Sequence, residues 1–154
     1  MILADTNIFI DFWNNPTKEL TEIFAKEDIV ICGVIRAELL HGAGSNKDYA
    51  NITAMLEAFD EKSFMPGDWQ TLGSNLYKLR KNGLTVPFSD AIIATIAIKN
   101  RIPVWTCDKH SRTFLRCTQY WAEFIRAFVQ ESSPLPQVLL RILSAASCSR
   151  ARTA

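Results

Sequence analysis

Two acidic residues end apolar segments of this chain. Asp5 follows the apolar residues 1–4, and Asp108 follows the largely apolar stretch 102–107. An apolar run without polar alternation is typical of a strand buried on both faces of a parallel sheet. Because ligands of such sheets bind at the carboxyl ends of the strands, both carboxylates are expected to face one cleft. Two carboxylates at strand tips suit a hard cation.

Two further acids are expected at the same opening. Glu38 lies about two turns into the helix that should follow the second strand, and Asp90 lies at the start of an Ile-rich helix. Clustered carboxylates repel one another by ~1 kcal/mol per pair at ~4 Å in water and by ~4 kcal/mol at an intermediate dielectric. Such a group takes up protons or is neutralised by a divalent cation. An all-oxygen ligand set favours Mg²⁺ or Mn²⁺ over zinc.

A cation held by these four acids would lower the pKa of a bound water and stabilise charge on a phosphate. It would also bridge the acidic site to an anionic substrate. Asn7 and Thr106 are expected to orient the carboxylates or the metal-bound waters.

Taken singly, each acid also has a structural explanation. Asp5 can cap the helix that follows its strand, and Asp90 is a favourable charge at a helix N-terminus. Glu38 can belong to a solvated helix face, and Asp108 can be an ordinary turn residue. The order and flanks of all four together favour a site.

The rest of the chain alternates between short apolar strands and amphipathic helices. Strands are expected at 1–4, 29–32 and 103–106, with a weaker one at 62–65. Helices are expected at 6–13, 17–26, 33–44, 48–59, 68–82, 89–100 and about 109, and residues 119–130 should form another helix or a final strand plus a helix. Thr17 and Ser89 should cap two of them, and Gly83 should end a third. Strands separated by helices predict an α/β fold with a parallel sheet and right-handed crossovers.

Length and composition fit one globular domain with a sizeable core. The chain has 154 residues, of which 48% are hydrophobic and 21% charged. No apolar run approaches the ~20 residues of a membrane span, and no signal peptide is evident, so a cytoplasmic protein is expected. The four cysteines include no C-x-x-C pair, which argues against a zinc site or a disulfide framework. We expect a domain at 1–131 and an extension at 132–154, with an amphipathic helix and a disordered end.

The charge balance limits how the chain could bind nucleic acid. The net charge is +1, but residues 132–154 carry three arginines and no acid, which leaves 14 basic and 16 acidic residues in the rest. Binding would therefore need a local basic patch or a bridging metal. Arg112 and Arg116 are one helical turn apart and close to Asp108, so they are the preferred phosphate contacts, ahead of other basic residues such as Arg36.

Four segments together resemble the PIN domain, and within it the VapC-type toxin ribonucleases. They are residues 3–8, 36–39 with Gly42 after them, 88–94 and 106–110, in the family's order, and the resemblance covers about residues 1–130. It implies a three-layer α/β/α fold with a central parallel sheet. The acidic quartet that binds Mg²⁺ or Mn²⁺ in this family falls on Asp5, Glu38, Asp90 and Asp108, and the small hydroxyl residue before the last aspartate falls on Thr106.

The resemblance also implies an activity and partners. Proteins of this type cleave RNA endonucleolytically, form homodimers and are held inactive by a cognate VapB-like antitoxin that buries a peptide near the active site. The chain departs from the pattern at Ser111, where many relatives carry an aromatic residue, and in its longer C-terminal tail.

We expect Asp5, Asp90 and Asp108 to hold one metal, and Glu38 to bind it or activate the attacking water, giving a 5′-phosphate and a 3′-hydroxyl. Two other functions stay open. A phosphatase could use Asp5 as nucleophile, although that class normally carries a second acid where this chain has Asn7. A non-catalytic PIN-like module could bind metal or RNA without cleaving.

Overall fold

A four-stranded parallel sheet forms the centre of the computed structural model, which describes residues 1–106. The strand order is β3-β2-β1-β4. The bounds are β1 (Ile2–Ala4), β2 (Ile29–Cys32), β3 (Asp60–Lys62) and β4 (Val104–Trp105). Leu3 pairs with Val30 of β2 on one side and with Val104 of β4 on the other. Every residue of β1 and β2 is buried, which confirms the interpretation of these apolar runs as central parallel strands.

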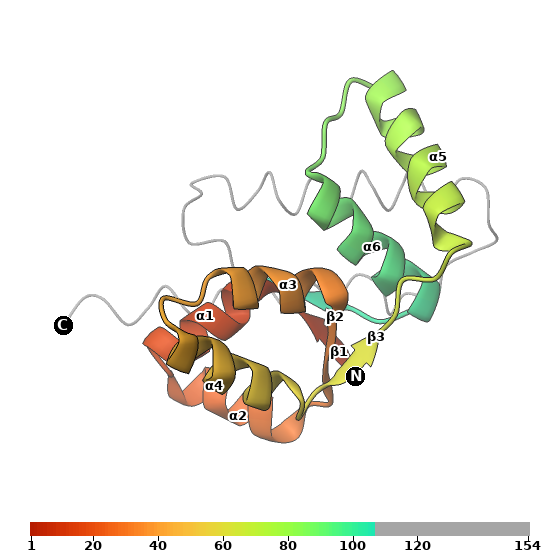
Figure 1. The fold of residues 1–154 in the computed structure, drawn as a ribbon. Coiled ribbons are helices and arrows are strands. Elements are labelled where there is room, and N and C mark those ends of the chain that lie inside the picture. Colours follow the sequence, from red (N-terminus) through yellow and green to blue (C-terminus); the bar gives the residue numbers. More distant parts are fainter. Residues whose placement is uncertain (107–154) are drawn as a thin grey trace.

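Helices connect the strands and complete a three-layer α/β/α fold (Figure 1). Those in the described part of the chain are α1 (Thr6–Asn14), α2 (Lys18–Lys26), α3 (Gly33–His41), α4 (Asn46–Leu56), α5 (Asp68–Lys81) and α6 (Phe88–Asn100). Helix α3 contacts α1, α4 and α6, whereas α5 packs along α6. Figure 1 shows α5 on the far side of α6 from α2 and α4. Helix α3, which carries Glu38, therefore occupies the middle of the helix arrangement.

Helix α6 is apolar on all sides, and it is buried in the core. Its residues 91–97 form seven consecutive buried positions. A helix that is hydrophobic all round belongs in a core. The sequence places this helix correctly, but its cap differs from the prediction. Pro87 is the N-cap residue and Ser89 lies in the first turn, so the expected capping role of Ser89 is wrong. Proline has a fixed φ and restricts the backbone conformation of the residue before it. Both properties suit the position directly before a helix.

Strand β3 lies two to three residues earlier than expected. The sequence predicts a weak strand at 62–65, but the strand is Asp60–Lys62, at the edge of the sheet. Its register pairs Ile31 with Glu61. An edge strand needs only one partner and tolerates charged side chains, so hydrophobic patterning does not locate it. Helix ends are nearer the predictions: α5 ends at Lys81, and Gly83 takes a positive φ of 77° after it, as expected of a C-terminal stop.

An aromatic cluster joins the start of the chain to β4. Phe9 of α1 meets Phe59 and Phe24 with ring centroids 5.3 Å and 5.6 Å apart. Phe24 in turn lies 5.6 Å from Trp105. Each aromatic pair stabilises the fold by about 0.5–1.5 kcal/mol beyond the area it buries. The cluster fixes Trp105 in the core and so sets the position of the next residue, Thr106.

No helix among residues 1–106 is long and apolar enough to span a membrane. The predicted helices near residue 109 and at 119–130, and the predicted extension at 132–154, lie outside the described residues.

Candidate active site

Asp5 lies at the carboxyl end of β1, and both of its carboxylate oxygens accept hydrogen bonds. The backbone amide of Thr6 donates to Oδ1 at 2.7 Å, so Asp5 caps α1, as its structural explanation required. The Thr106 hydroxyl donates to Oδ2, also at 2.7 Å. The Asp5 amide donates to the Trp105 carbonyl at 2.8 Å. Because β1 and β4 are neighbours in the sheet, a residue 101 positions away reaches Asp5 directly.

Glu38 approaches the same strand tip from α3. Its carboxylate is on the exposed side of the helix, and its Oε2 accepts a hydrogen bond of 2.5 Å from the Thr6 hydroxyl. Thr6 therefore binds one carboxylate through its amide and another through its side chain. Hydrogen bonds to charged acceptors are shorter and stronger than neutral ones. This single residue fixes the relative positions of Asp5 and Glu38.

Asp90 lies in the first turn of α6 and is partly buried. The pKa of this carboxyl is raised from 3.8 to about 6, chiefly by burial and then by the negative charges of Asp5 and Glu38. A hydrogen bond with the Ser89 side chain acts in the opposite direction. Asp90 is thus within electrostatic reach of both other acids. Elevated carboxyl pKa values of this origin are a recognised mark of functional sites.

The described structure therefore brings Asp5, Glu38 and Asp90 to one edge of the sheet. Within residues 1–106, no group of three or more acidic, histidine or cysteine side chains has an arrangement that could hold a metal ion by itself. The three carboxylates influence one another electrostatically without converging on one point. The predicted fourth acid, Asp108, and the predicted phosphate contacts Arg112 and Arg116 lie outside the described residues.

The two residues expected to support the acids differ in their contacts. Thr106 donates to Asp5. Asn7 is exposed on α1, and its side chain makes no hydrogen bond to any described residue. Thr6 takes the supporting role instead, and sequence reasoning missed it. The sequence does show a hydroxyl residue directly after the acid at the end of the strand. Its partner, Glu38 of α3, is set by tertiary packing, which the sequence does not display.

Cys32 lies near the acids but offers no thiolate. Its side chain is buried at the end of β2. Burial is the largest effect and raises the pKa of the thiol, backbone hydrogen bonds at Ile35 and Val34 act against it, and the charges of Glu61 and Glu38 add to the rise. A neutral thiol is a poor metal ligand. The ligand chemistry in the described part of this edge is therefore that of carboxylate oxygens.

Arg36 is engaged in the structure of the domain. Its Nε donates to Glu61 Oε2 at 2.6 Å, and the ion pair is about one-third exposed on each side. A longer contact of 3.5 Å joins the guanidinium to the Leu56 carbonyl. Arg36 therefore links α3 to β3 and to the end of α4. Because its guanidinium is used in these contacts, it is less available to bind an RNA phosphate.

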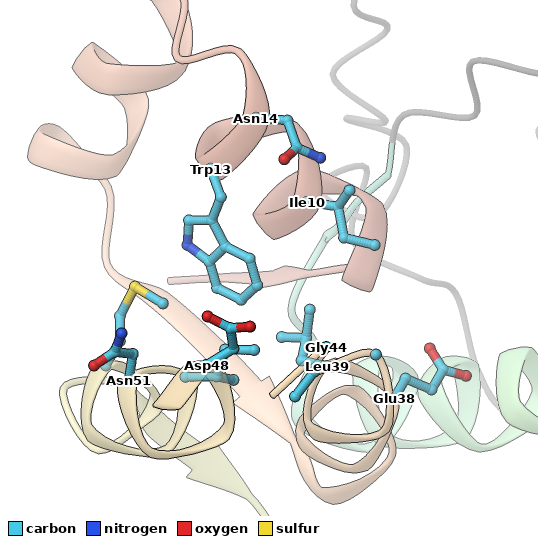
Figure 2. A pocket seen from close by; sticks show the side chains of 12 residues that line it. Ile10, Trp13, Asn14, Glu38, Leu39, Gly44, Asp48 and Asn51 are labelled. Atoms are coloured by element: carbon cyan, nitrogen blue, oxygen red, sulfur yellow. The ribbon is translucent and has the colours of Figure 1, made fainter. Parts of the chain in front are cut away.

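A groove opens on one side of Glu38 (Figure 2). It has a volume of about 530 Å³ and lies between α1, the end of α3 with the following loop, and α4. Its wall is formed by Ile10, Trp13, Asn14, Glu38, Leu39, Gly42, Ala43, Gly44, Asp48, Asn51, Ile52 and Met55. Figure 2 shows Trp13 extending from α1 towards the segment that carries Asp48. Glu38 is the residue shared by the groove and the acidic edge.

Several solved structures are similar to this chain in fold. VapBC-1 from nontypeable Haemophilus influenzae is 25% identical, the match covers 77% of this chain and 94% of that one, and the TM-score is 0.61. VapBC2 from Rickettsia felis, bound to a promoter DNA fragment, is 22% identical over 75% and 92% of the two chains, with a TM-score of 0.59. VapC20 from Mycobacterium tuberculosis, a toxin that cleaves the sarcin–ricin loop, is 13% identical over 71% and 92%, with a TM-score of 0.55.

No curated protein matches the chain. The family model of the PIN domain matches residues 2–115, which is well over half of the chain and includes all four predicted acids. The fold shared with the solved structures and the parallel sheet with acids at its carboxyl edge agree with this match. The chain belongs to the PIN domain family.

Proposed function

We propose that this protein is a VapC-type toxin, a metal-dependent endoribonuclease whose ion is held by Asp5, Glu38, Asp90 and Asp108. The observation that carries the proposal is the link through Thr6. Its amide binds Asp5 and its hydroxyl binds Glu38, while the charges of both acids raise the pKa of Asp90. The three carboxylates lie within electrostatic reach of one another, and a cation bound with the help of Asp108 would relieve their mutual repulsion.

The donor set fits a magnesium-class ion. The described donors are carboxylate oxygens, and the nearby thiol of Cys32 is neutral. Oxygen ligands suit Mg²⁺ or Mn²⁺. When bound, such an ion would neutralise the acids and stabilise charge on a phosphate. Asp108 would supply the fourth carboxylate.

The protein's own residues divide the remaining work. The Thr106 hydroxyl fixes Asp5, and the Thr6 hydroxyl occupies one oxygen of Glu38. The second oxygen of Glu38 either binds the ion or accepts a proton from the attacking water. The water oxygen bonds to phosphorus as the bond to the 3′ oxygen breaks, and the 3′ oxygen takes a proton from solvent, which leaves a 5′-phosphate and a 3′-hydroxyl. Arg112 and Arg116 would hold flanking phosphates.

The proposed partners follow from the structural neighbours. Several of these are VapBC toxin–antitoxin assemblies, among them the pair from Salmonella typhimurium bound to DNA, which is 22% identical. We expect a VapB-like antitoxin to inhibit this chain by binding near the acids, and we expect a homodimer in the cytoplasm. Co-expression with any small protein encoded beside it, followed by mass measurement of the purified complex, tests both partners.

Cleavage of a pooled RNA tests the activity. The purified chain is incubated with Mg²⁺, with Mn²⁺ or with EDTA, and the new ends are mapped. We expect metal-dependent internal cuts with 5′-phosphate ends, which Asp5→Asn abolishes and Asp60→Asn, at an exposed acid of β3, leaves intact. Equal cleavage by Asp5→Asn contradicts the proposal. Metal binding without turnover on any RNA favours the non-catalytic module, and a trapped aspartyl-phosphate favours the phosphatase.

A further inference from the structure

We propose that the groove beside Glu38 binds a nucleobase of the RNA next to the scissile phosphate and prefers bases with an exocyclic amino group. The inference rests on the proposed ribonuclease function, and it assigns a specificity site to it. It is carried by the position of the groove, its size and the chemistry of its wall.

The position follows from Glu38. This residue belongs both to the acidic edge, through its hydrogen bond from Thr6, and to the wall of the groove. An RNA strand with its scissile phosphate at the acids must place a neighbouring nucleotide within one sugar of that phosphate. The groove begins at Glu38, so the base of such a nucleotide can enter it without a second binding surface.

The size and polarity of the groove suit a base. A volume of about 530 Å³ lies within the ~300–1,000 Å³ of ordinary ligand pockets. One side is apolar and includes the Trp13 indole, and single-stranded bases stack on aromatic side chains in many RNA complexes. The amides of Asn14 and Asn51 can donate and accept hydrogen bonds at the polar side.

The charge of the groove indicates which base. Asp48 lines its wall, Glu38 lies at its edge with its carboxylate turned towards the acidic edge, and none of its lining residues is lysine or arginine. A phosphate is therefore repelled from the groove, whereas an amino group is attracted. Carboxylates accept hydrogen bonds from the amino group of cytosine, and asparagine pairs with adenine. Uracil presents a carbonyl oxygen where cytosine has its amino group, so it offers the Asp48 carboxylate no donor at that position.

Asp48 is the residue best suited to test this preference. Its Oδ2 accepts a hydrogen bond of 2.7 Å from the Ser45 hydroxyl, which also caps α4 through the Asp48 amide. This capping pair fixes the carboxylate at the start of the helix, beside Gly44. Asparagine at position 48 keeps the size of the side chain and the backbone cap but replaces an acceptor-only group by one that can also donate.

The experiment compares short RNAs that differ only by cytosine or uracil at one position flanking the cleavage site. For the wild-type protein we expect kcat/KM to be about tenfold higher with cytosine at one of the two flanking positions, a ratio equivalent to ~1.4 kcal/mol. Asp48→Asn should reduce this ratio below about threefold. Glu57→Gln, at an exposed acid after α4 that does not line the groove, should leave the ratio unchanged.

A binding measurement separates this inference from the proposed function. The same RNAs are titrated by fluorescence anisotropy into Asp5→Asn protein, with and without Asp48→Asn. Suppose that the wild-type protein cleaves no RNA, while Asp5→Asn protein binds the cytosine RNA more tightly than the uracil RNA and loses this preference in combination with Asp48→Asn. The cleavage proposal then fails and the base site stands. Cleavage with equal ratios for wild type and Asp48→Asn overturns the base site. The base site is also overturned if Asp48→Asn changes only the affinity for the antitoxin. That result would assign the groove to a protein partner.

Discussion

The hydroxyl of Thr6 donates a 2.5 Å hydrogen bond to Glu38, a residue 32 positions later on another helix. The amide of Thr6 binds Asp5 at the same time. The contact between α1 and α3 is therefore also the contact that aligns two of the acids. Residues that orient metal ligands in this way commonly change metal affinity by 10–100-fold when they are replaced.

Replacement of Thr6 by valine should weaken metal binding. Valine keeps the shape of the side chain and the backbone bond to Asp5 but removes the donor to Glu38. We expect Mn²⁺ affinity to fall about tenfold, or ~1.4 kcal/mol, in a calorimetric titration. Thr6→Ser keeps a hydroxyl and should restore most of the affinity. Equal losses in the serine and valine variants would indicate a packing effect and contradict the positioning role.

Asp90 should make the stability of the metal-free protein depend on pH. Its folded pKa of about 6 lies above the ordinary 3.8, so folding favours the protonated form. The charged form costs stability above pH 6, and the cost disappears as the pH falls towards 4. We expect Asp90→Asn to stabilise the protein by about 1–2 kcal/mol at pH 7.5, a value reduced for solvent screening of a partly exposed carboxyl, and by little at pH 4.

Urea unfolding in EDTA at several pH values measures this difference, with Asp60→Asn as the control acid. A stabilisation by Asp90→Asn that is the same at pH 7.5 and pH 4 would rule out the electrostatic origin. The same protonation should compete with the ion, so we also expect Mn²⁺ affinity to decline as the pH falls through 6.

Arg36 should contribute to stability and little to RNA binding. Its bond to Glu61 joins α3 to β3 and is only about one-third exposed. We expect Arg36→Met to lower the free energy of unfolding by about 1 kcal/mol and to leave the salt dependence of RNA binding unchanged. Filter binding from 50 to 200 mM salt checks the second point. A flatter slope in Arg36→Met would show that the guanidinium binds phosphate after all.

Arg112 and Arg116 should behave in the opposite way. If each neutralises one phosphate of a single strand, replacing both by glutamine should reduce the slope of log K against log salt by about 1.4. Unfolding in urea should change little, since arginines that bind phosphate rather than groups of the protein contribute little to its stability. An unchanged slope would remove both residues from the RNA-binding surface.

The sequence predicts the centre of this fold because local and tertiary preferences agree there. The apolar runs of β1 and β2 can only be buried, and the pattern of α6 can only belong to a core. Such elements carry Asp5 and Asp90, while Glu38 follows β2 by a fixed distance along α3. The positions of these three acids at the sheet edge could therefore be argued before any coordinates.

Other features depend on packing that the sequence does not display. The strand at Asp60–Lys62 is charged, and it is a strand because β2 offers an edge to pair with. The role of Thr6 requires α1 and α3 to lie in contact, and the groove requires α4 to lie against them at a particular distance. None of these has a local signature in hydrophobic periodicity.

Direct titration with Mn²⁺ tests the central claim that these acids form one metal site. We expect the wild-type protein to bind the ion, and Asp5→Asn, Glu38→Gln and Asp90→Asn each to lose at least tenfold in affinity while remaining folded by circular dichroism. Asp60→Asn should bind like the wild type. Affinity that is the same in all three acid variants as in the wild type, or no Mn²⁺ binding by the folded wild-type protein, would contradict the account.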